Sequence, residues 1–275
     1  MSGLEALDPG GPALWGAAGV LAFAGLVHGT LGLGFPMTAT PLLALFLDLR
    51  SAILVTLLPT VAVNLVSILR GGRWSRSLGR YWPLAAYTVA GSAMGTTLLI
   101  VTPPEPYRLW LAGIILLYLN LDRLHGHGPH WVHEHRALAL AVFGLAAGLS
   151  VGTVNVMVPL LIILFLELDE PPLVMVQVFN LCFLGGKLAQ MGAFASAGLF
   201  DAAVATTTLP LLAAGLAGLA VGMAIRDRIP ERAYRRALRA VLWVVALVQL
   251  IQFGAWLHAT LGPAYGGTVR TASTG

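Results

Sequence analysis

Eight long apolar stretches, separated by short polar segments, constrain this chain more than any other feature of its sequence. They cover residues 13–47, 51–69, 81–101, 107–120, 138–167, 172–195, 202–225 and 237–257. Only 10% of the residues are charged, whereas a soluble domain carries about 25%. We therefore expect an all-α, polytopic membrane protein that crosses a lipid bilayer several times and has little chain left for a soluble domain.

The ends of the chain and its single cysteine narrow the class further. The N-terminal "MSGLEALDPGG" has no basic residue, so we do not expect a cleavable secretory signal. Cys182 is the only cysteine, which excludes an intrachain disulfide and a cysteine-based metal cluster. The formal net charge of +4 does not indicate a nucleic-acid partner, because arginines near helix ends set membrane topology. We expect the small, polar tail at 261–275 to be flexible.

Two of the apolar stretches are too long for one crossing. As a single helix, residues 14–47 would extend about 51 Å, against about 30 Å for the hydrocarbon core. Glycines, small hydroxyl residues and a proline interrupt both stretches, in "GTLGLGFPMTATP" (29–41) and "GLSVGTVNVMVP" (148–159). Broken backbone at membrane depth survives only where it is buried in protein or lines a polar cavity. We expect a broken or hairpin helix in each, with a tilted, kinked helix as the alternative.

The sequence also repeats itself. The matching segments are 25–49 with 144–168, 91–95 with 218–222, and 107–108 with 234–235. The spacing is 119 residues for the first pair and 127 for the other two, which indicates a duplicated unit of roughly 120 residues. In the second pair, "GSAMG" and "GLAVG" each place two glycines four residues apart, a spacing that lets helices approach closely. The expected organisation is a first transmembrane repeat (1–120), a cytoplasmic His-rich linker (121–137) and a second transmembrane repeat (138–260).

Arginine placement predicts how the two repeats are oriented. Segment 70–80 has four arginines and segment 226–239 has six, so both should be cytoplasmic, while 102–106 and 196–200 have none. Both loops fall on one side only if each long stretch is a hairpin that returns to its starting side. Each repeat of about four helical elements then crosses an odd net number of times, so the copies are inverted and both chain ends lie outside. The acidic "ELDE" run falls on the cytoplasmic side, although acidic residues carry little weight in this rule.

The inverted arrangement predicts a transporter with a site near the bilayer midplane. Inverted repeats with a break in each half are typical of transporters, and half-helix N-termini at the breaks suit an anion. A charge at membrane depth costs at least about 2.5–3.5 kcal/mol, and Lys187 is the only lysine in the chain. We therefore expect Lys187 to bind an anionic substrate, with a lysine that snorkels to the interface as the alternative.

Polar residues on two helices and at both breaks complete the predicted site. The substrate-binding candidates are Gln177, Asn180, Lys187 and Gln190 on helix 172–195, Thr56, Thr60, Asn64 and Ser67 on helix 51–69, and Gly32, Gly34, Thr38, Ser150, Gly152, Thr153 and Asn155 at the breaks. Each helical set falls on one face of its helix. The alternative is that these residues only make helix-to-helix hydrogen bonds. His28, just before the first break, is a candidate for proton coupling or a packed, hydrogen-bonded histidine.

A glycine-rich break followed by "PLL", in "GTLGLGFPMTATPLL" and again in "GLSVGTVNVMVPLL", resembles the sulfite exporter TauE/SafE family. The resemblance covers about residues 14–257. It implies a multi-pass transporter of the bacterial cytoplasmic membrane that moves sulfite, sulfoacetate or other organosulfonates, often outward. From the inverted repeats we expect alternating access around the midplane site. The expected partners are a small anionic substrate and the bilayer, with transport either as equilibrium flux or coupled to H⁺ or Na⁺. We expect no cofactor and no nucleic-acid partner. The residues themselves indicate only a small anion.

A histidine-rich segment offers a different function. "HGHGPHWVHEH" (125–135) has five histidines in eleven residues, which could bind zinc, nickel or copper. The protein would then be a divalent metal-ion transporter, or an anion carrier regulated by metal, although a solvated cytoplasmic loop is the other interpretation. We do not expect an enzyme, because no span carries a Ser/His/Asp set, a paired-carboxylate site or an H-E-x-x-H motif. Haem is disfavoured because only His28 and His258 lie in or near spans.

Overall fold

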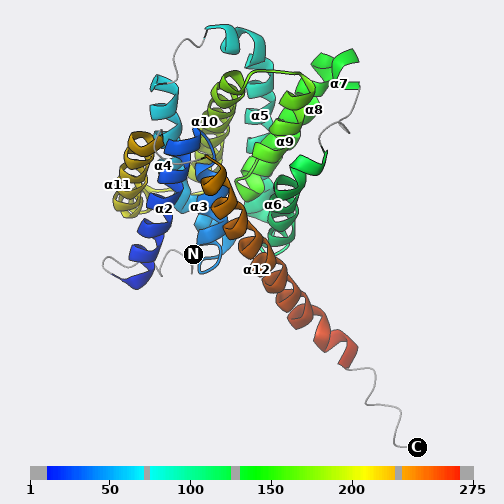
Figure 1. The fold of residues 1–275 in the computed structure, drawn as a ribbon. Helices are drawn as coiled ribbons and strands as arrows, with labels where there is room; N and C mark the ends of the chain where they lie inside the picture. The colour runs from blue at the N-terminus through cyan, green and yellow to red at the C-terminus, as the bar shows by residue number, and fades with distance from the viewer. Residues whose placement is uncertain (1–10, 71–74, 125–130, 227–230, 267–275) are drawn as a thin grey trace, which may run out of the picture.

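The computed structural model of the protein describes residues 11–70, 75–124, 131–226 and 231–266, and this part of the chain is helical and without strands. The first half contains α2 (Pro12–Leu31), α3 (Phe35–Leu43), α4 (Leu49–Arg70), α5 (Ser75–Val101) and α6 (Tyr107–Leu124). After the short α7 (Trp131–Glu134), the second half contains α8 (Arg136–Val154), α9 (Val158–Glu167), α10 (Pro172–Ser196), α11 (Ala202–Ile225) and α12 (Glu231–Gly266) (Figure 1).

Seven helices are long and apolar enough to cross a membrane, so the predicted all-α, polytopic class is confirmed. They lie in α2, α4, α5, α8, α10, α11 and α12. Helices also occupy parts of the expected linker and of the expected tail. α12 continues to Gly266 and so enters the tail expected at 261–275, while α6 and α7 extend into the expected linker at 121–137.

The first long apolar stretch is a broken helix that turns back on itself. α2 ends at Leu31, and Gly32 and Gly34 then have φ angles of +79° and +104°. Glycine reaches this region without the steric penalty that a Cβ would bring. After α3, Phe46 lies beside Gly16, with its ring 3.9 Å from the place where a Cβ on Gly16 would stand. The stretch therefore returns to its starting end, which confirms the predicted break and excludes a single kinked helix.

The second long stretch has the same shape. α8 ends at Val154, Asn155 has a φ of +63°, and α9 begins at Val158. Asparagine is among the few residues other than glycine that often adopt this conformation. Arg136, at the start of α8, and Glu170, just after α9, both bond to the hydroxyl of Tyr81, so both ends of the hairpin lie together.

Glycine-lined faces hold each hairpin against a helix of the other half. α2 packs on α11, and α8 packs on α5. A Cβ on Gly218 would lie 1.9 Å from the carbonyl oxygen of Ala22, and one on Gly91 would lie 2.4 Å from that of Leu145. No side chain fits at such distances, so the structure confirms that the two glycine pairs allow close helix packing.

The two halves pack by one pattern. α2 contacts α11 as α8 contacts α5, and α4 contacts α11 as α10 contacts α5. Two further pairs, α4 with α10 and α6 with α12, join corresponding helices directly. If each helix is replaced by the corresponding helix of the other half, the same set of contacting pairs results, as a duplicated unit predicts.

The segments rich in arginine meet at one end of the bundle, here called the arginine-rich end. Arg70 Nη1, at the end of α4, lies 3.6 Å from the sulfur of Met223 near the end of α11. Arg80 at the start of α5 pairs with Glu170 at this same end. The opposite end holds Arg108, which donates to the carbonyl of Ala44 after α3. This geometry agrees with a shared side for segments 70–80 and 226–239.

Candidate substrate site at the hairpin tips

The tips of the two hairpins are residues 32–34 and 155–157, and an amide at the second tip bonds to α3 of the first hairpin and to α4. Asn155 Nδ2 donates to the hydroxyl of Thr40 on α3 at 2.6 Å and to that of Thr56 on α4 at 2.9 Å. All three residues are completely buried. The second hairpin is thereby tied to the first hairpin and to α4 at the same point. Sequence reasoning selected Asn155 and Thr56 but missed Thr40, whose hydroxyl lies in the same interrupted segment as Thr38.

His28 fixes the first tip. Its Nδ1 accepts the backbone N–H of Phe35, the first residue of α3, at 3.3 Å. Its Nε2 lies 2.9 Å from the hydroxyl of Ser67 on α4, and that hydroxyl donates its own proton to the carbonyl of Val63. Nε2 therefore carries the proton and donates to Ser67, which makes His28 a neutral, packed imidazole in this structure.

α10 supports both tips with side-chain amides. Asn180 Nδ2 donates to the carbonyl of Gly32 at 3.1 Å, at the first tip. Three turns further along, Gln190 Nε2 donates to the carbonyl of Gly152 at 3.0 Å, just before the second tip. One helix therefore supplies hydrogen bonds to the backbone of both breaks.

α4 and α10 run in opposite directions between the tips. Along α4, Thr56 contacts the second tip and Ser67, further on, contacts the histidine of the first. Along α10, Asn180 contacts the first tip and Gln190 lies near the second. These are corresponding helices of the two halves, so the halves approach the tips from opposite directions.

Four buried side chains, on α3, on α4 and at the second tip, have polar atoms without a hydrogen-bond partner in the described part of the chain. They are Thr38 Oγ1, Thr60 Oγ1, both amide atoms of Asn64, and Asn155 Oδ1. We call these four residues the unpaired polar cluster. Each is at most 1% exposed. A buried polar group left unpaired typically costs about 1–3 kcal/mol, so a group of them needs a physical reason.

Lys187 is completely buried on α10, and its amine donates to Oε1 of Gln190 one turn away. A protonated lysine has three hydrogens to donate, and the structure gives this amine one partner among the residues it describes. The carboxylates whose side chains the structure describes are Asp48, Glu105, Glu134, Glu167, Asp169, Glu170 and Asp201, all near helix ends. Within the described spans, Lys187 thus has no acidic counter-ion. Its complete burial argues against a side chain that snorkels to the interface.

The comparison with family models decides the family. The model of the sulfite exporter TauE/SafE family matches residues 17–248, which include both hairpins, α4 and α10. The chain belongs to this family. The resemblance seen in the sequence is therefore confirmed, and the protein is a membrane transporter of the TauE/SafE type. Comparisons with curated proteins and with solved structures gave no match.

In this TauE/SafE member, the predicted site residues lie mostly in the protein interior. Some of them form hydrogen bonds within their own helix, and others form hydrogen bonds to a different helix. Ser67 and Gly32 are partly exposed, and the others are buried. Ser150 and Thr153 donate to carbonyls of their own helix, Ala146 at 2.9 Å and Leu149 at 2.7 Å, as structural hydroxyls do. The residues that link helices, such as Asn155 and Asn180, are the ones that hold the tips. A substrate-binding role for any of them stays a prediction.

The N-termini at the tips offer fewer free N–H groups than the sequence suggested. The N–H of Phe35 is taken by His28, and Pro36 and Pro159 have none. At α9, the N–H of Leu160 bonds to the carbonyl of Met157 at 3.1 Å. The helix dipoles still favour negative charge near both tips. Side chains must therefore provide most of the hydrogen bonds to a substrate.

The metal-binding prediction falls largely outside the described residues. His125, His127 and His130 belong to a segment that the structure does not describe, while His133 and His135 are exposed near α7. Within the described ranges, no group of three His, Cys, Asp or Glu residues could hold a metal ion. The metal-transport alternative gains no supporting observation from this TauE/SafE structure.

Proposed function

We propose that this TauE/SafE member exports a small sulfur-containing anion, such as sulfite, sulfoacetate or another organosulfonate, across the bacterial cytoplasmic membrane. The observation that carries this proposal is Lys187, which is completely buried without an acidic partner in the described spans. A buried charge without a counter-ion is strongly destabilising. An anionic substrate would supply the missing charge when it binds.

The unpaired polar cluster would supply hydrogen bonds to the same substrate. The hydroxyls of Thr38 and Thr60 and the amide of Asn64 are donors that have no partner among the described residues. Sulfite and sulfonates present three oxygens that accept such hydrogen bonds, and bonds to a charged acceptor are stronger than neutral ones. Because the same groups are unpaired in this structure, the substrate would remove their energetic penalty on binding.

Alternating access follows from the two halves acting as inverted repeats around the tips. The opposite directions of α4 and α10 and the exchange symmetry of the helix contacts support this part of the proposal. Each hairpin packs on a helix of the other half, α2 on α11 and α8 on α5, so these pairs are natural rigid units. Rocking of one pair against the other would expose the tips first to one side and then to the other.

His28 is the candidate for proton coupling within this proposal. Protonation would place a second N–H on Nδ1, which could then no longer accept the N–H of Phe35. The first tip would lose one of its anchors, which links proton binding to movement of the hairpin. Na⁺ is the alternative coupling ion.

Counterflow in liposomes that contain the purified protein tests the proposed function. Labelled sulfoacetate or sulfite inside the vesicles should exchange with external sulfite, sulfoacetate or a related organosulfonate, and not with Zn²⁺, Ni²⁺ or Cu²⁺. Acetate, sulfate and taurine define the selectivity of the site. Flux of metals without flux of any of the anions would contradict the proposal.

A further inference from the structure

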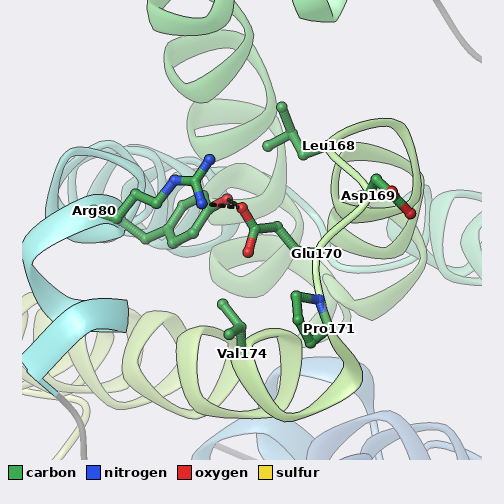
Figure 2. A pocket seen from close by; sticks show the side chains of 7 residues that line it. Arg80, Leu168, Asp169, Glu170, Pro171 and Val174 are labelled. Atoms are coloured by element: carbon green, nitrogen blue, oxygen red, sulfur yellow. Dashed lines mark hydrogen bonds and ion pairs between the residues drawn. The ribbon is translucent and has the colours of Figure 1, made fainter.

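A cavity of about 480 Å³ opens at the arginine-rich end, away from the hairpin tips. Arg80 of α5 and Glu170 of the α9–α10 connection are in direct contact at its wall, and Leu168, Asp169, Pro171 and Val174 also line it (Figure 2). The side chain of Arg80 is 53% exposed, whereas that of Glu170 is only 7% exposed. The volume lies in the range of pockets that bind small organic ligands, about 300–1,000 Å³.

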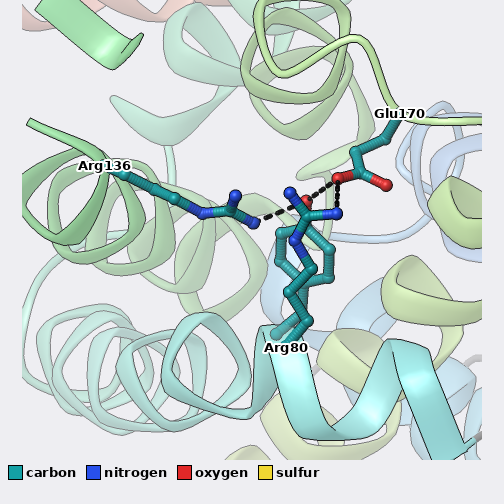
Figure 3. Close-up of polar contacts among 4 residues, drawn as sticks. Arg80, Arg136 and Glu170 are labelled. Carbon is teal, nitrogen blue, oxygen red and sulfur yellow. Dashed lines mark hydrogen bonds and ion pairs between the residues drawn. The ribbon is translucent and has the colours of Figure 1, made fainter. Parts of the chain in front are cut away.

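The polar contacts in this cavity converge on one carboxylate oxygen. Glu170 Oε1 lies 2.6 Å from Arg80 Nη1 and accepts the hydroxyl of Tyr81 at 2.7 Å. Arg136 of α8 donates from Nη2 to the Tyr81 oxygen at 3.1 Å, which leaves the phenol proton directed at the carboxylate (Figure 3). A guanidinium and a hydroxyl that converge on one anionic oxygen form a binding arrangement for an oxyanion.

The corresponding positions at the opposite end of the bundle carry no such cluster, so the fold itself does not require it. The matching positions at spacings of 119 and 127 are Ser51 for Glu170, Ala17 for Arg136, Thr207 for Arg80 and Thr208 for Tyr81. The cluster of Arg80, Tyr81, Arg136 and Glu170 thus occurs only at the arginine-rich end, and the residues at the four corresponding positions are uncharged. A feature present on one side of a duplicated transporter can give the two sides different substrate affinities.

We propose that Arg80 and Tyr81 form an entry site for a small oxyanion, and that the carboxylate of Glu170 occupies this site until the anion displaces it. The inference rests on the proposed function, because it assigns the site to the same sulfite or sulfonate substrate. The Glu170 carboxylate and the substrate anion would both accept hydrogen bonds from the Arg80 guanidinium and the Tyr81 hydroxyl, so they would compete directly for these donors. Displacement of Glu170 also frees the connection between α9 and α10, at the base of the hairpin whose tip carries Asn155.

Sided transport kinetics test the entry site. Inside-out and right-side-out membrane vesicles present opposite faces, and the KM for sulfoacetate is measured from each. Glu170→Gln removes the tethered competitor, so the KM from the arginine-rich side should fall about three- to tenfold, with the KM from the other side unchanged. Arg80→Gln should raise the KM from the arginine-rich side by a similar factor. Glu134→Gln is the matched control, since it removes an exposed carboxylate near the start of α8, at the same end of the bundle, that does not line the cavity.

The outcomes separate this inference from the proposed function. An unchanged KM in Glu170→Gln, an equal change from both sides, or an equal change in Glu134→Gln would overturn the entry site while leaving the proposed transport intact. Absence of anion flux in the wild-type protein would instead overturn the proposed function and the entry site with it. If Glu170→Gln does not yield folded protein, Tyr81→Phe decides, because it keeps the ring and removes one donor. It should raise the KM from the arginine-rich side, and no change there would overturn the entry site.

Discussion

The two hairpins of this TauE/SafE transporter share one shape but hold their tips in different ways. At the first tip, Gly32 and Gly34 provide the turn, and side chains from outside it, His28 and Asn180, anchor its backbone. At the second tip, Asn155 both adopts the left-handed conformation and donates to two other helices. The duplicated fold therefore fixes the backbone path, while the chemistry of each tip is set by its own residues.

If the two halves are inverted, the two hairpins enter the membrane from opposite sides. Single cysteines at Gly79 and Arg226, which are exposed at the arginine-rich end, should react from the cytoplasmic face only. Cysteines at Pro103 and Ala197 should react from the periplasmic face only. An impermeant thiol reagent, applied to intact cells and to inside-out vesicles in a Cys182→Ala background, makes the result all-or-none. Opposite accessibility of positions 79 and 226 would rule out the inverted arrangement.

Glycines near the two tips should respond very differently to substitution. A Cβ on Gly152 would lie 2.5 Å from the carbonyl oxygen of Ser92 and 2.6 Å from the nitrogen of Thr96, so Gly152→Leu should separate α8 from α5 and abolish folding. A Cβ on Gly32 meets only a side chain, Val176, at 3.2 Å. Gly32→Ala should therefore cost about 1–3 kcal/mol through its positive φ and still give folded protein. Yield and melting temperature of the purified variants measure both effects, and Gly198→Ala is the control for a positive φ away from the tips.

Asn155 combines two roles that a pair of substitutions can separate. Asn155→Gly keeps the left-handed backbone and loses the bonds to Thr40 and Thr56, which should destabilise the protein by about 1–3 kcal/mol. Asn155→Ala adds backbone strain and should be less stable still by about 1 kcal/mol. Thermal unfolding of both proteins gives the two contributions. Equal melting temperatures for both variants would show that the tip conformation is not strained.

The length and the Gly/Pro pattern of the long stretches were sufficient to predict both breaks, because a helix of that length does not fit the bilayer. Helical periodicity likewise placed Thr56, Asn64, Asn180 and Lys187 on buried faces. Partner choice was not predictable in this way. The Arg80–Glu170 ion pair joins residues 90 positions apart in the sequence. The hydrogen bond from the backbone N–H of Phe35 to His28 depends on the conformation of the turn between α2 and α3. Both follow from tertiary packing, which a single sequence pattern does not encode.

A smaller effect is expected at Asn180, which supports the first tip from α10. Asn180→Ala removes its bond to the carbonyl of Gly32 and should weaken substrate affinity by about two- to tenfold, the scale of one neutral hydrogen bond. Thr206→Ala, an exposed hydroxyl on α11, serves as the control and should bind substrate normally. Binding is measured by calorimetry with sulfoacetate. An affinity equal to that of the wild-type protein would show that the first tip does not shape the site.

The most direct test of the central claim is one preparation of Lys187→Gln in which melting temperature and substrate affinity are both measured. If the buried amine binds the anion, affinity should fall by about ten- to a hundredfold, because a charge-assisted hydrogen bond contributes about 1.5–3 kcal/mol. The melting temperature should not fall, since an unpaired buried charge is removed. Lys187→Arg should restore affinity only in part, because a planar guanidinium replaces a compact ammonium. A lower melting temperature with unchanged affinity would contradict the account and make Lys187 a structural residue.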